Sequence, residues 1–207
     1  MGILSLAFQL SNSLKKTIYL AYLKERLGYL GRDVQIDPTA QFRYSKTIYI
    51  GDRCRIYAGA TLVGIPGESE IGLSLGMRCK VHENAFLDAY SGQIILGTNV
   101  YIGHSSIICG HGSLTIGDNT MISGLCYVIP ANHIFIDSEI PLRYQGETRR
   151  GIIIGKNVWV GAGCTILDGV SIGDNAVVGA GSVVSRDIPP WAVALGIPAR
   201  VVRFRQY

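Results

Sequence analysis

His133 lies in a polar stretch, residues 129–151, that reads IPANHIFIDSEIPLRYQGETRRG. An imidazole has an ordinary pKa near ~6.5, so at neutral pH it can accept a proton from an attacking hydroxyl as a general base. A lone histidine can equally be an ordinary residue of a surface loop. The choice between these interpretations depends on the elements that position the stretch.

The other three histidines do not form a recognisable metal site. A catalytic zinc ion of the histidine type needs three such ligands converging on one point. His104 and His111 are seven residues apart at a predicted turn, and His82 follows an apolar residue that we expect to be buried. We therefore expect no metal. His82 should face solvent, whereas His104 or His111 could touch a substrate.

Aliphatic residues recur every six positions over most of the chain, and a fixed period of this kind indicates a solenoid. Three hexads make an 18-residue triangular coil in which one aliphatic side chain per hexad points inward. The longest run, with glycine after four of its six members, is Ile154, Val160, Ile166, Ile172, Val178 and Val184. Earlier runs are Ile50, Ile56, Leu62; Leu75, Val81, Leu87; Leu96, Ile102, Ile108; and Ile116, Ile122, Val128.

A second inward position follows each aliphatic residue by four and holds small or β-branched residues, since bulk would not fit there. Four of the five cysteines occupy this position, namely Cys54, Cys79, Cys126 and Cys164. We interpret them as small buried residues rather than nucleophiles, metal ligands or disulfide partners. Only Cys109 lies outside the pattern. With no CxxC pair and no recognisable export signal, we expect a reducing, cytoplasmic location.

The period breaks most strongly around the stretch that contains His133. The interval from Ile116 to Ile154 is 20 residues longer than one 18-residue coil, and all of the excess follows Val128. One long loop should therefore project from a corner of the solenoid. Long ordered loops on rigid scaffolds are usually functional, which favours a functional role for His133.

The hexads, the PANH sequence ending at His133 and the later GKNVWVGAG together resemble the hexapeptide-repeat acyltransferases over residues 34–203. The resemblance is to sugar and polysaccharide O-acetyltransferases, such as those acting on maltose and galactosides. It implies an all-β, left-handed parallel β-helix of about six to seven triangular coils. It also implies a homotrimer with active sites between subunits, and transfer from acetyl-CoA with His133 as general base. Because the cysteines should point inward, we expect direct transfer rather than an acyl-enzyme.

The C-terminal segment resembles the coenzyme A site of that family. Ala162 and Ala180 match small residues beside the pantetheine arm, although a tight turn would explain them equally well. Ser185 and Arg186 match residues near the phosphates. Arg200 and Arg203 match a basic pair near the adenosine, although a solvated basic tail is the plainer explanation. Trp159 could pack against the loop or the thioester arm.

The acceptor side is expected from the same resemblance. The asparagine that contacts the sugar in galactoside and maltose acetyltransferases falls on Ser105 here. This difference argues against those two acceptors. The shorter NHxF form and the stretch PLRYQGETRRG resemble enzymes that acetylate surface polysaccharides or their precursors. In that case Asp137 and Gln145, in the projecting loop, become candidates for contacts with sugar hydroxyls.

The charge of the chain and its N-terminal segment bear on its possible partners. A net charge of +4 without interleaved aromatic residues argues against nucleic acid as a partner. The N-terminal apolar stretch is too short to span a bilayer. Residues 3–30 predict one or two short amphipathic helices that pack on the main body, or that attach weakly to a membrane surface.

The chain is thus divided into an N-terminal helical segment, 1–33, a β-helix, 34–188, with an inserted loop, 131–150, and a C-terminal tail, 189–207. Three alternatives to a sugar O-acetyltransferase remain. One is N-acetylation of a nucleotide-linked amino sugar. The others are a γ-type carbonic anhydrase, which the histidine spacing disfavours, and a non-catalytic β-helix scaffold, since a fold alone does not establish function.

Overall fold

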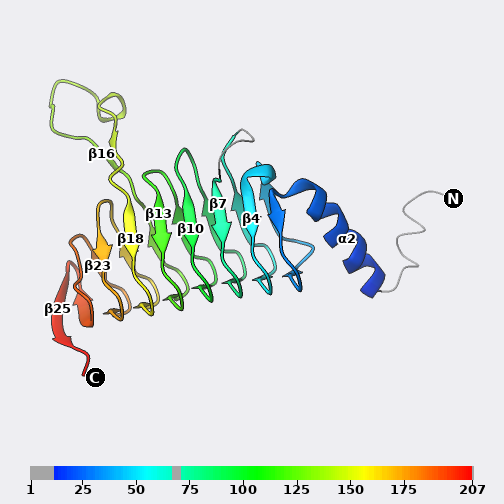
Figure 1. Cartoon of the computed structure of the whole chain (residues 1–207). Coiled ribbons are helices and arrows are strands. Elements are labelled where there is room, and N and C mark those ends of the chain that lie inside the picture. Colours follow the sequence, from blue (N-terminus) through cyan, green and yellow to red (C-terminus); the bar gives the residue numbers. More distant parts are fainter. Residues whose placement is uncertain (1–11, 67–70, 207) are drawn as a thin grey trace.

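The computed structural model describes residues 12–66 and 71–206, and it shows a solenoid of about seven turns with one helix (Figure 1). The helix α2, Asn12–Arg26, lies at the N-terminal end of the solenoid. Leu23 on this helix and Leu27 just after it are buried in the core, whereas Ile18 and Tyr22 are exposed. No helix in the described ranges is long and apolar enough to cross a bilayer. Expectations for residues 1–11 lie outside the described part.

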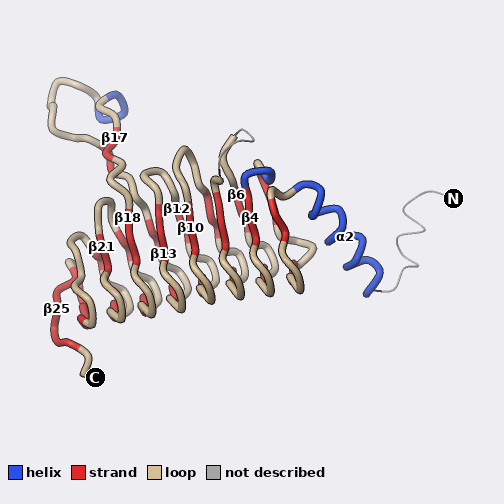
Figure 2. The backbone as a smooth tube through the Cα atoms, in the orientation of Figure 1, coloured by secondary structure: helices blue, strands red, loops and turns tan. Residues whose placement is uncertain are grey.

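Three parallel sheets run along the solenoid, and the chain visits them in the order first, second, third in every turn (Figure 2). The strands of the first sheet are β1 Tyr29–Leu30, β4 Ile48–Ile50, β7 Leu73–Leu75, β10 Ile94–Leu96, β13 Leu114–Ile116, β18 Ile152–Ile154 and β21 Ser171–Ile172. Those of the third sheet are β3 Gln41–Arg43, β6 Thr61–Val63, β9 Phe86–Asp88, β12 Ile107–Cys109, β15 Tyr127–Val128, β20 Thr165–Ile166 and β23 Val183–Val184.

The second sheet also includes the C-terminal segment. Its strands are β2 Gln35–Ile36, β5 Arg55–Ile56, β8 Lys80–Val81, β11 Tyr101–Ile102, β14 Met121–Ile122, β19 Trp159–Val160, β22 Val177–Val178, β24 Ala192–Gly196 and β25 Ala199–Phe204. β24 pairs in parallel with β22, and β25 folds back antiparallel to β24. The segment expected as a tail, 189–207, therefore forms a hairpin that extends this sheet.

The predicted hexads form the core. All 18 aliphatic hexad residues, from Ile50 to Val184, are at most 2% exposed. The four cysteines at the small inward position are at most 1% exposed, as are Ser106, Thr120 and Ser182. Pairing begins earlier than residue 34, because β1 already pairs with β4. The first turn also keeps the six-residue spacing, with Leu30, Ile36 and Phe42 paired to Ile50, Ile56 and Leu62, and the hexad runs above missed it. Leu30 and Phe42 are partly buried and pack against the core.

The turns stack closely at the corner between the first and second sheets. A Cβ on Gly117 would lie 2.7 Å from the backbone of Gly155 in the next turn, so only glycine fits. Asn119 and Asn157 two residues after these glycines adopt positive φ values of 59° and 54°, which asparagine tolerates better than most residues. This stacking explains why the hexads carry glycine after the aliphatic residue.

The insertion projects from the corner between the third and first sheets, as predicted (Figure 1). It leaves the solenoid after β15 and returns at β18, and its two ends pair as an antiparallel ladder of β16, Asn132–His133, and β17, Glu147–Thr148. Its outer part contains a short 3-10 helix η2, Leu142–Tyr144, and a similar turn η1, Ser45–Thr47, lies between the first coil and β4. The ladder gives the two ends of the loop a defined register.

Candidate functional site

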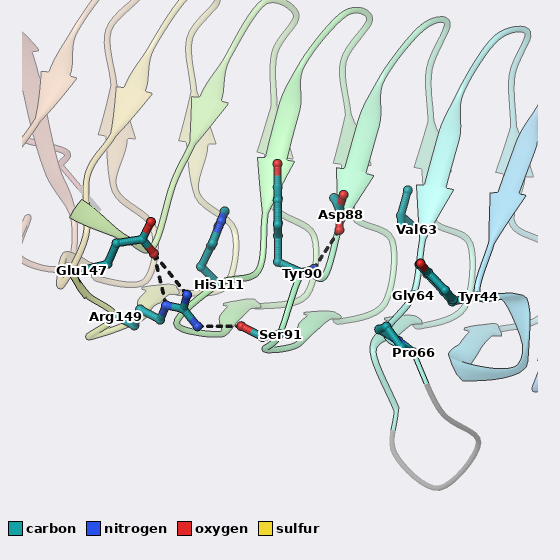
Figure 3. Close-up of a pocket in the computed structure, with 10 residues that line it drawn as sticks. All are labelled: Tyr44, Val63, Gly64, Pro66, Asp88, Tyr90, Ser91, His111, Glu147 and Arg149. Atoms are coloured by element: carbon teal, nitrogen blue, oxygen red, sulfur yellow. Dashed lines mark hydrogen bonds and ion pairs between the residues drawn. The ribbon is translucent and has the colours of Figure 1, made fainter. Parts of the chain in front are cut away.

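An open cleft of about 380 Å³ lies along the corner between the third and first sheets, beside the foot of the loop (Figure 3). Five successive turns of the solenoid, from the first to the one that bears the loop, contribute residues to it, and the loop closes it at one end. The lining residues are Tyr44, Val63, Gly64, Pro66, Asp88, Tyr90, Ser91, His111, Glu147 and Arg149. A concave site with a few converging polar groups is the expected form of a small-molecule site.

His133 stands opposite Glu147 in the β16–β17 ladder, and Glu147 lines the cleft, so the ladder places His133 beside the cleft. The His133 Nδ1 lies 3.8 Å from the Glu147 Oε1, and the two side chains are 69% and 29% exposed. That separation is longer than a direct hydrogen bond, so the contact is electrostatic. A carboxylate beside Nδ1 favours the tautomer with its proton on Nδ1, which leaves Nε2 as the proton acceptor.

Glu147 is itself held from the other side. The Arg149 guanidinium donates hydrogen bonds to the Glu147 Oε2 from Nη2 at 3.1 Å and from Nε at 3.3 Å. The Arg149 Nη1 donates to the Ser91 hydroxyl at 2.7 Å, two turns away along the corner. A series of side-chain contacts therefore connects the loop to the rigid solenoid, running from Ser91 through Arg149 and Glu147 to His133.

Asp168 anchors the returning end of the loop. Its side chain is 1% exposed, and its Oδ1 accepts the backbone N–H groups of Arg150 at 2.8 Å and Gly151 at 3.1 Å. Its Oδ2 accepts the Thr148 hydroxyl at 2.8 Å and the Arg150 Nε at 3.4 Å. A buried carboxylate with this many donors is well compensated, so it fixes the backbone immediately after Glu147.

His111 forms part of the cleft wall. Its ring stacks on Tyr90 with the centroids 3.7 Å apart, and its Nδ1 is buried with no hydrogen-bond partner among the described residues. Burial lowers the pKa of His111, and the nearby Arg149 acts in the same direction, while Glu147 and Asp88 oppose it. The ring is therefore neutral at pH 7, as suits a stacked wall rather than a charged group.

The other histidines lie elsewhere. His82, expected to face solvent, has a side chain only 21% exposed, because its ring stacks against Tyr57 at 4.2 Å and packs against Tyr101 at 4.5 Å. His104 lies over Gly124 at the corner between the second and third sheets. No group of three or more His, Cys, Asp or Glu side chains in residues 12–66 and 71–206 could hold a metal ion.

The two loop residues proposed for sugar contacts interact with each other. The Gln145 Oε1 accepts the Asp137 N–H at 3.1 Å, and its Nε2 donates to the carbonyl oxygens of Asp137 and Ile140, both at 2.7 Å. The Gln145 amide is thus engaged in closing the loop. The Asp137 carboxylate accepts the Glu139 N–H at 2.8 Å.

The residues expected at the coenzyme lie in three places. Trp159 and Arg203 line a groove of about 340 Å³ on the outer face of the second sheet, where the Trp159 Nε1 donates to the Ser123 hydroxyl at 3.2 Å. Ala162 and Ala180 are exposed and stack one turn apart at the second-to-third corner, where the Gly181 N–H donates to the Ala162 carbonyl at 2.8 Å.

The C-terminal end holds three further residues expected at the coenzyme, all exposed: Ser185, Arg186 and Arg200. Ser185 and Arg186 follow β23 at the third-to-first corner, which is the corner that bears the loop. Arg200 lies on β25 and donates from Nη1 to the Ala199 carbonyl at 3.0 Å. Ser105, the expected acceptor residue, follows β11 at the second-to-third corner with a φ of 54°. One protomer therefore does not gather these residues around His133.

Of the residues that line the cleft, sequence reasoning singled out only His111. It missed Glu147 and Tyr90 in the cleft, and also Asp168, which anchors the loop. Glu147 follows His133 by 14 residues, a spacing without meaning until the loop ends are paired. Tyr90 and His111 align only once successive turns are stacked, because Asp88 pairs with Cys109. A count of the corner residues turn by turn would have aligned Tyr90 with His111.

Comparisons with known proteins agree with this architecture. The family described as bacterial transferase hexapeptide (six repeats) matches residues 151–186. Nodulation protein L of Rhizobium leguminosarum bv. viciae is 36% identical over 160 residues, which is 77% of each chain. The galactoside O-acetyltransferase of Escherichia coli is 40% identical over 133 residues, covering 61% of this chain and 64% of that protein.

A solved structure has the same fold. AntD, an N-acyltransferase from Bacillus cereus in complex with dTDP and 3-hydroxybutyryl-CoA, superposes with a TM-score of 0.63 at 21% identity, over 91% of this chain and 88% of that one. Against several curated relatives the chain spans only 45% to 64% of their length.

Proposed function

Since the chain belongs to the hexapeptide-repeat transferases, we propose that it is an acetyl-CoA-dependent O-acetyltransferase that acts on a sugar or surface-polysaccharide hydroxyl. The single observation that carries the proposal is the His133–Glu147 pair, fixed by the β16–β17 ladder at the edge of an open cleft. The name of the galactoside O-acetyltransferase relative supports the same reaction class.

In this proposal His133 is the general base. The acceptor hydroxyl oxygen attacks the thioester carbonyl carbon while its proton passes to the His133 Nε2, and the carbon–sulfur bond then breaks. The imidazolium returns the proton to the departing thiolate, so coenzyme A leaves as a thiol. Glu147 stabilises the imidazolium that forms in between. Direct transfer, without an acyl-enzyme, is supported by the burial of all five cysteines.

Acetyl-CoA is the proposed donor, and Trp159, Ala162, Ala180, Ser185, Arg186, Arg200 and Arg203 are its proposed contacts. Exposed arginines suit its phosphates. Ala162, Ala180 and Ser105 lie on a different corner of the solenoid from His133, with the third sheet between the two corners. A site that uses both corners needs two copies of the chain side by side, which supports the homotrimer expected from the family. Light scattering tests it through the molar mass.

We also propose that the N-terminal helix attaches weakly to an anionic membrane surface. Ile18 and Tyr22 are exposed on α2, and Lys24 and Arg26 lie in its last turn. An amphipathic helix with apolar and basic residues can lie at a membrane interface. Co-sedimentation with vesicles containing anionic lipid, compared with neutral vesicles, tests this; equal and negligible binding to both would refute it.

The catalytic proposal is tested by following thiol release from acetyl-CoA over a panel of neutral sugars, oligosaccharides and amino sugars. We expect acceptor-dependent release with a hydroxyl acceptor. Mild alkali then removes the acetyl group from the product, because an ester hydrolyses where an amide survives. An alkali-stable product would instead indicate transfer to an amine. Thiol release that no acceptor stimulates would contradict the proposal and favour a scaffold role.

A further inference from the structure

The cleft contains a column of side chains with one gap. Five successive turns each contribute a residue to the cleft at this corner, in the order Tyr44, Gly64, Tyr90, His111 and Arg149. Extending the strand registers places Gly64 beside Tyr44 and beside Ala89, the residue before Tyr90. Tyr90 and His111 come from adjacent turns and stack directly. Between Tyr90 and Tyr44 the intervening turn presents Gly64, which has no side chain. Figure 3 shows the same order along the corner.

The gap is built into the backbone. A Cβ on Gly64 would collide with the Thr47 hydroxyl and with the Tyr44 carbonyl oxygen, so position 64 cannot carry a side chain. Tyr90 uses one ring face against His111, and the other face is turned toward the row of Gly64 (Figure 3). Tyr90 and Tyr44 are 42% and 56% exposed, which leaves both rings accessible.

The dimensions of the gap suit a ring-shaped ligand. Neighbouring turns are about 4.8 Å apart, so two turns leave about 9.6 Å between the rows of Tyr90 and Tyr44. A ring placed over Gly64 would lie about one turn spacing from each tyrosine. The whole column, from Tyr44 to Arg149, covers about 19 Å, which is longer than a single sugar ring.

The polar groups favour an uncharged ligand. Asp88 accepts the Tyr90 N–H through Oδ1 at 2.7 Å, and its Oδ2 has no hydrogen bond in the described part of the chain. The charged residues of the cleft are Asp88, Glu147 and Arg149, and the Arg149 charge is already paired with Glu147. A net negative cleft repels phosphate and carboxylate groups, whereas Asp88 can accept a hydroxyl donor.

We propose that the gap over Gly64 between Tyr90 and Tyr44 is a distal acceptor subsite that holds one uncharged pyranose ring of an oligosaccharide or polysaccharide. The C–H faces of such a ring pack on the tyrosine rings, while Asp88 accepts one of its hydroxyls. The reacting sugar of the same chain lies at the other end of the cleft, beside Glu147 and His133. The inference rests on the proposed function, and it selects polymeric acceptors over free monosaccharides.

The test compares maltohexaose, cellohexaose and chitohexaose with glucose and N-acetylglucosamine. Binding is measured by saturation-transfer NMR and calorimetry, and transfer by kcat/KM. The variants are Tyr90→Asn and Tyr44→Asn, because both positions have φ near 50° and asparagine tolerates that backbone. Tyr90→Phe keeps the ring, and Tyr29→Asn removes an equally exposed tyrosine, on β1.

We expect at least one hexasaccharide to be preferred over its monomer. Both asparagine variants should weaken hexasaccharide binding and kcat/KM roughly five- to tenfold, in line with the loss of one aromatic contact, and leave the monomer within about twofold. Tyr90→Phe and Tyr29→Asn should behave like the unaltered chain. Unchanged thermal unfolding of each variant shows that the fold is intact.

The inference would be overturned by binding of none of the hexasaccharides at millimolar concentration, or by equal losses for hexasaccharide and monomer in the tyrosine variants. Preferred binding of a phosphorylated or nucleotide-linked sugar would also contradict it. A different result would refute the proposed function without refuting the subsite. Tyrosine-dependent hexasaccharide binding without acetyl transfer would refute the O-acetyltransferase and leave the subsite standing.

Discussion

At the scale of single residues, Glu147 is the closest charged neighbour of the His133 imidazole, at 3.8 Å. We expect Glu147→Gln to lower kcat about tenfold with little change in the KM for acetyl-CoA, because Glu147 acts on His133 and not on the coenzyme. Glu147→Asp, which keeps the carboxylate, should recover part of the loss. Steady-state kinetics provides the measurement. A change confined to KM would show that Glu147 has another role.

His111 should make folding sensitive to pH. Burial lowers its pKa below the ordinary 6.5, so the unfolded chain takes up a proton at a higher pH than the folded chain does. The contribution of neutral His111 to the free energy of unfolding is fully present above about pH 6.5. It is lost as the pH falls through the pKa of His111 in the folded chain. Urea unfolding between pH 7.5 and 5 should therefore show a steeper loss for the unaltered chain than for His111→Phe. Parallel slopes would contradict this.

At the scale of elements, the loop depends on its anchor at Asp168. Asp168→Ala would leave the backbone N–H groups of Arg150 and Gly151 without their acceptor. We expect a loss of about 2–5 kcal/mol in the stability of the loop foot, seen as faster hydrogen exchange at 147–151. Activity should fall in parallel because His133 and Glu147 lose their fixed register.

A matched control for this variant lies on another corner. Asp118 also accepts a backbone N–H, that of Thr98, at 2.8 Å, but far from the loop and with a half-exposed side chain. Asp118→Ala should leave exchange at 147–151 unchanged. If both variants loosened the loop to the same degree, the anchor would not be specific to Asp168.

Sequence alone predicted elements whose cause is local. The hexads identified the inward face, the small inward position explained four cysteines, and the excess length between Val128 and Ile154 located the loop. The partners of that loop depend on register across turns, which no local pattern encodes. Glu147 meets His133 only through the β16–β17 ladder, and Asp168 reaches Arg150 only because the next turn stacks beneath it.

At the scale of the whole molecule, the solenoid is stabilised by one continuous apolar core. Ile102 is fully buried in its middle, and Ile102→Ala should cost about 2–5 kcal/mol in the free energy of unfolding. Ile153 on β18 is 59% exposed, and Ile153→Ala should cost about 0.5 kcal/mol or less. Chemical denaturation of both variants measures the difference. Similar losses would mean that the inward face has been misassigned.

The same rigid body has a functional consequence. Turns stacked at a fixed spacing place Tyr44, Tyr90 and Arg149 along one corner cleft, while the insertion pairs His133 with Glu147, which lines the same cleft. The scaffold determines distances along the cleft. In the proposed function, the corner residues select the acceptor and the loop provides the catalytic base.

The most direct test of the central proposal is the rate of acetyl transfer by His133→Ala, measured with the best acceptor of the panel and alongside calorimetric binding of coenzyme A. Loss of a general base predicts a fall in kcat of roughly 10²- to 10⁴-fold with coenzyme binding retained. Transfer at a near-normal rate by this variant, with its fold intact, would contradict the assignment of His133 as the base.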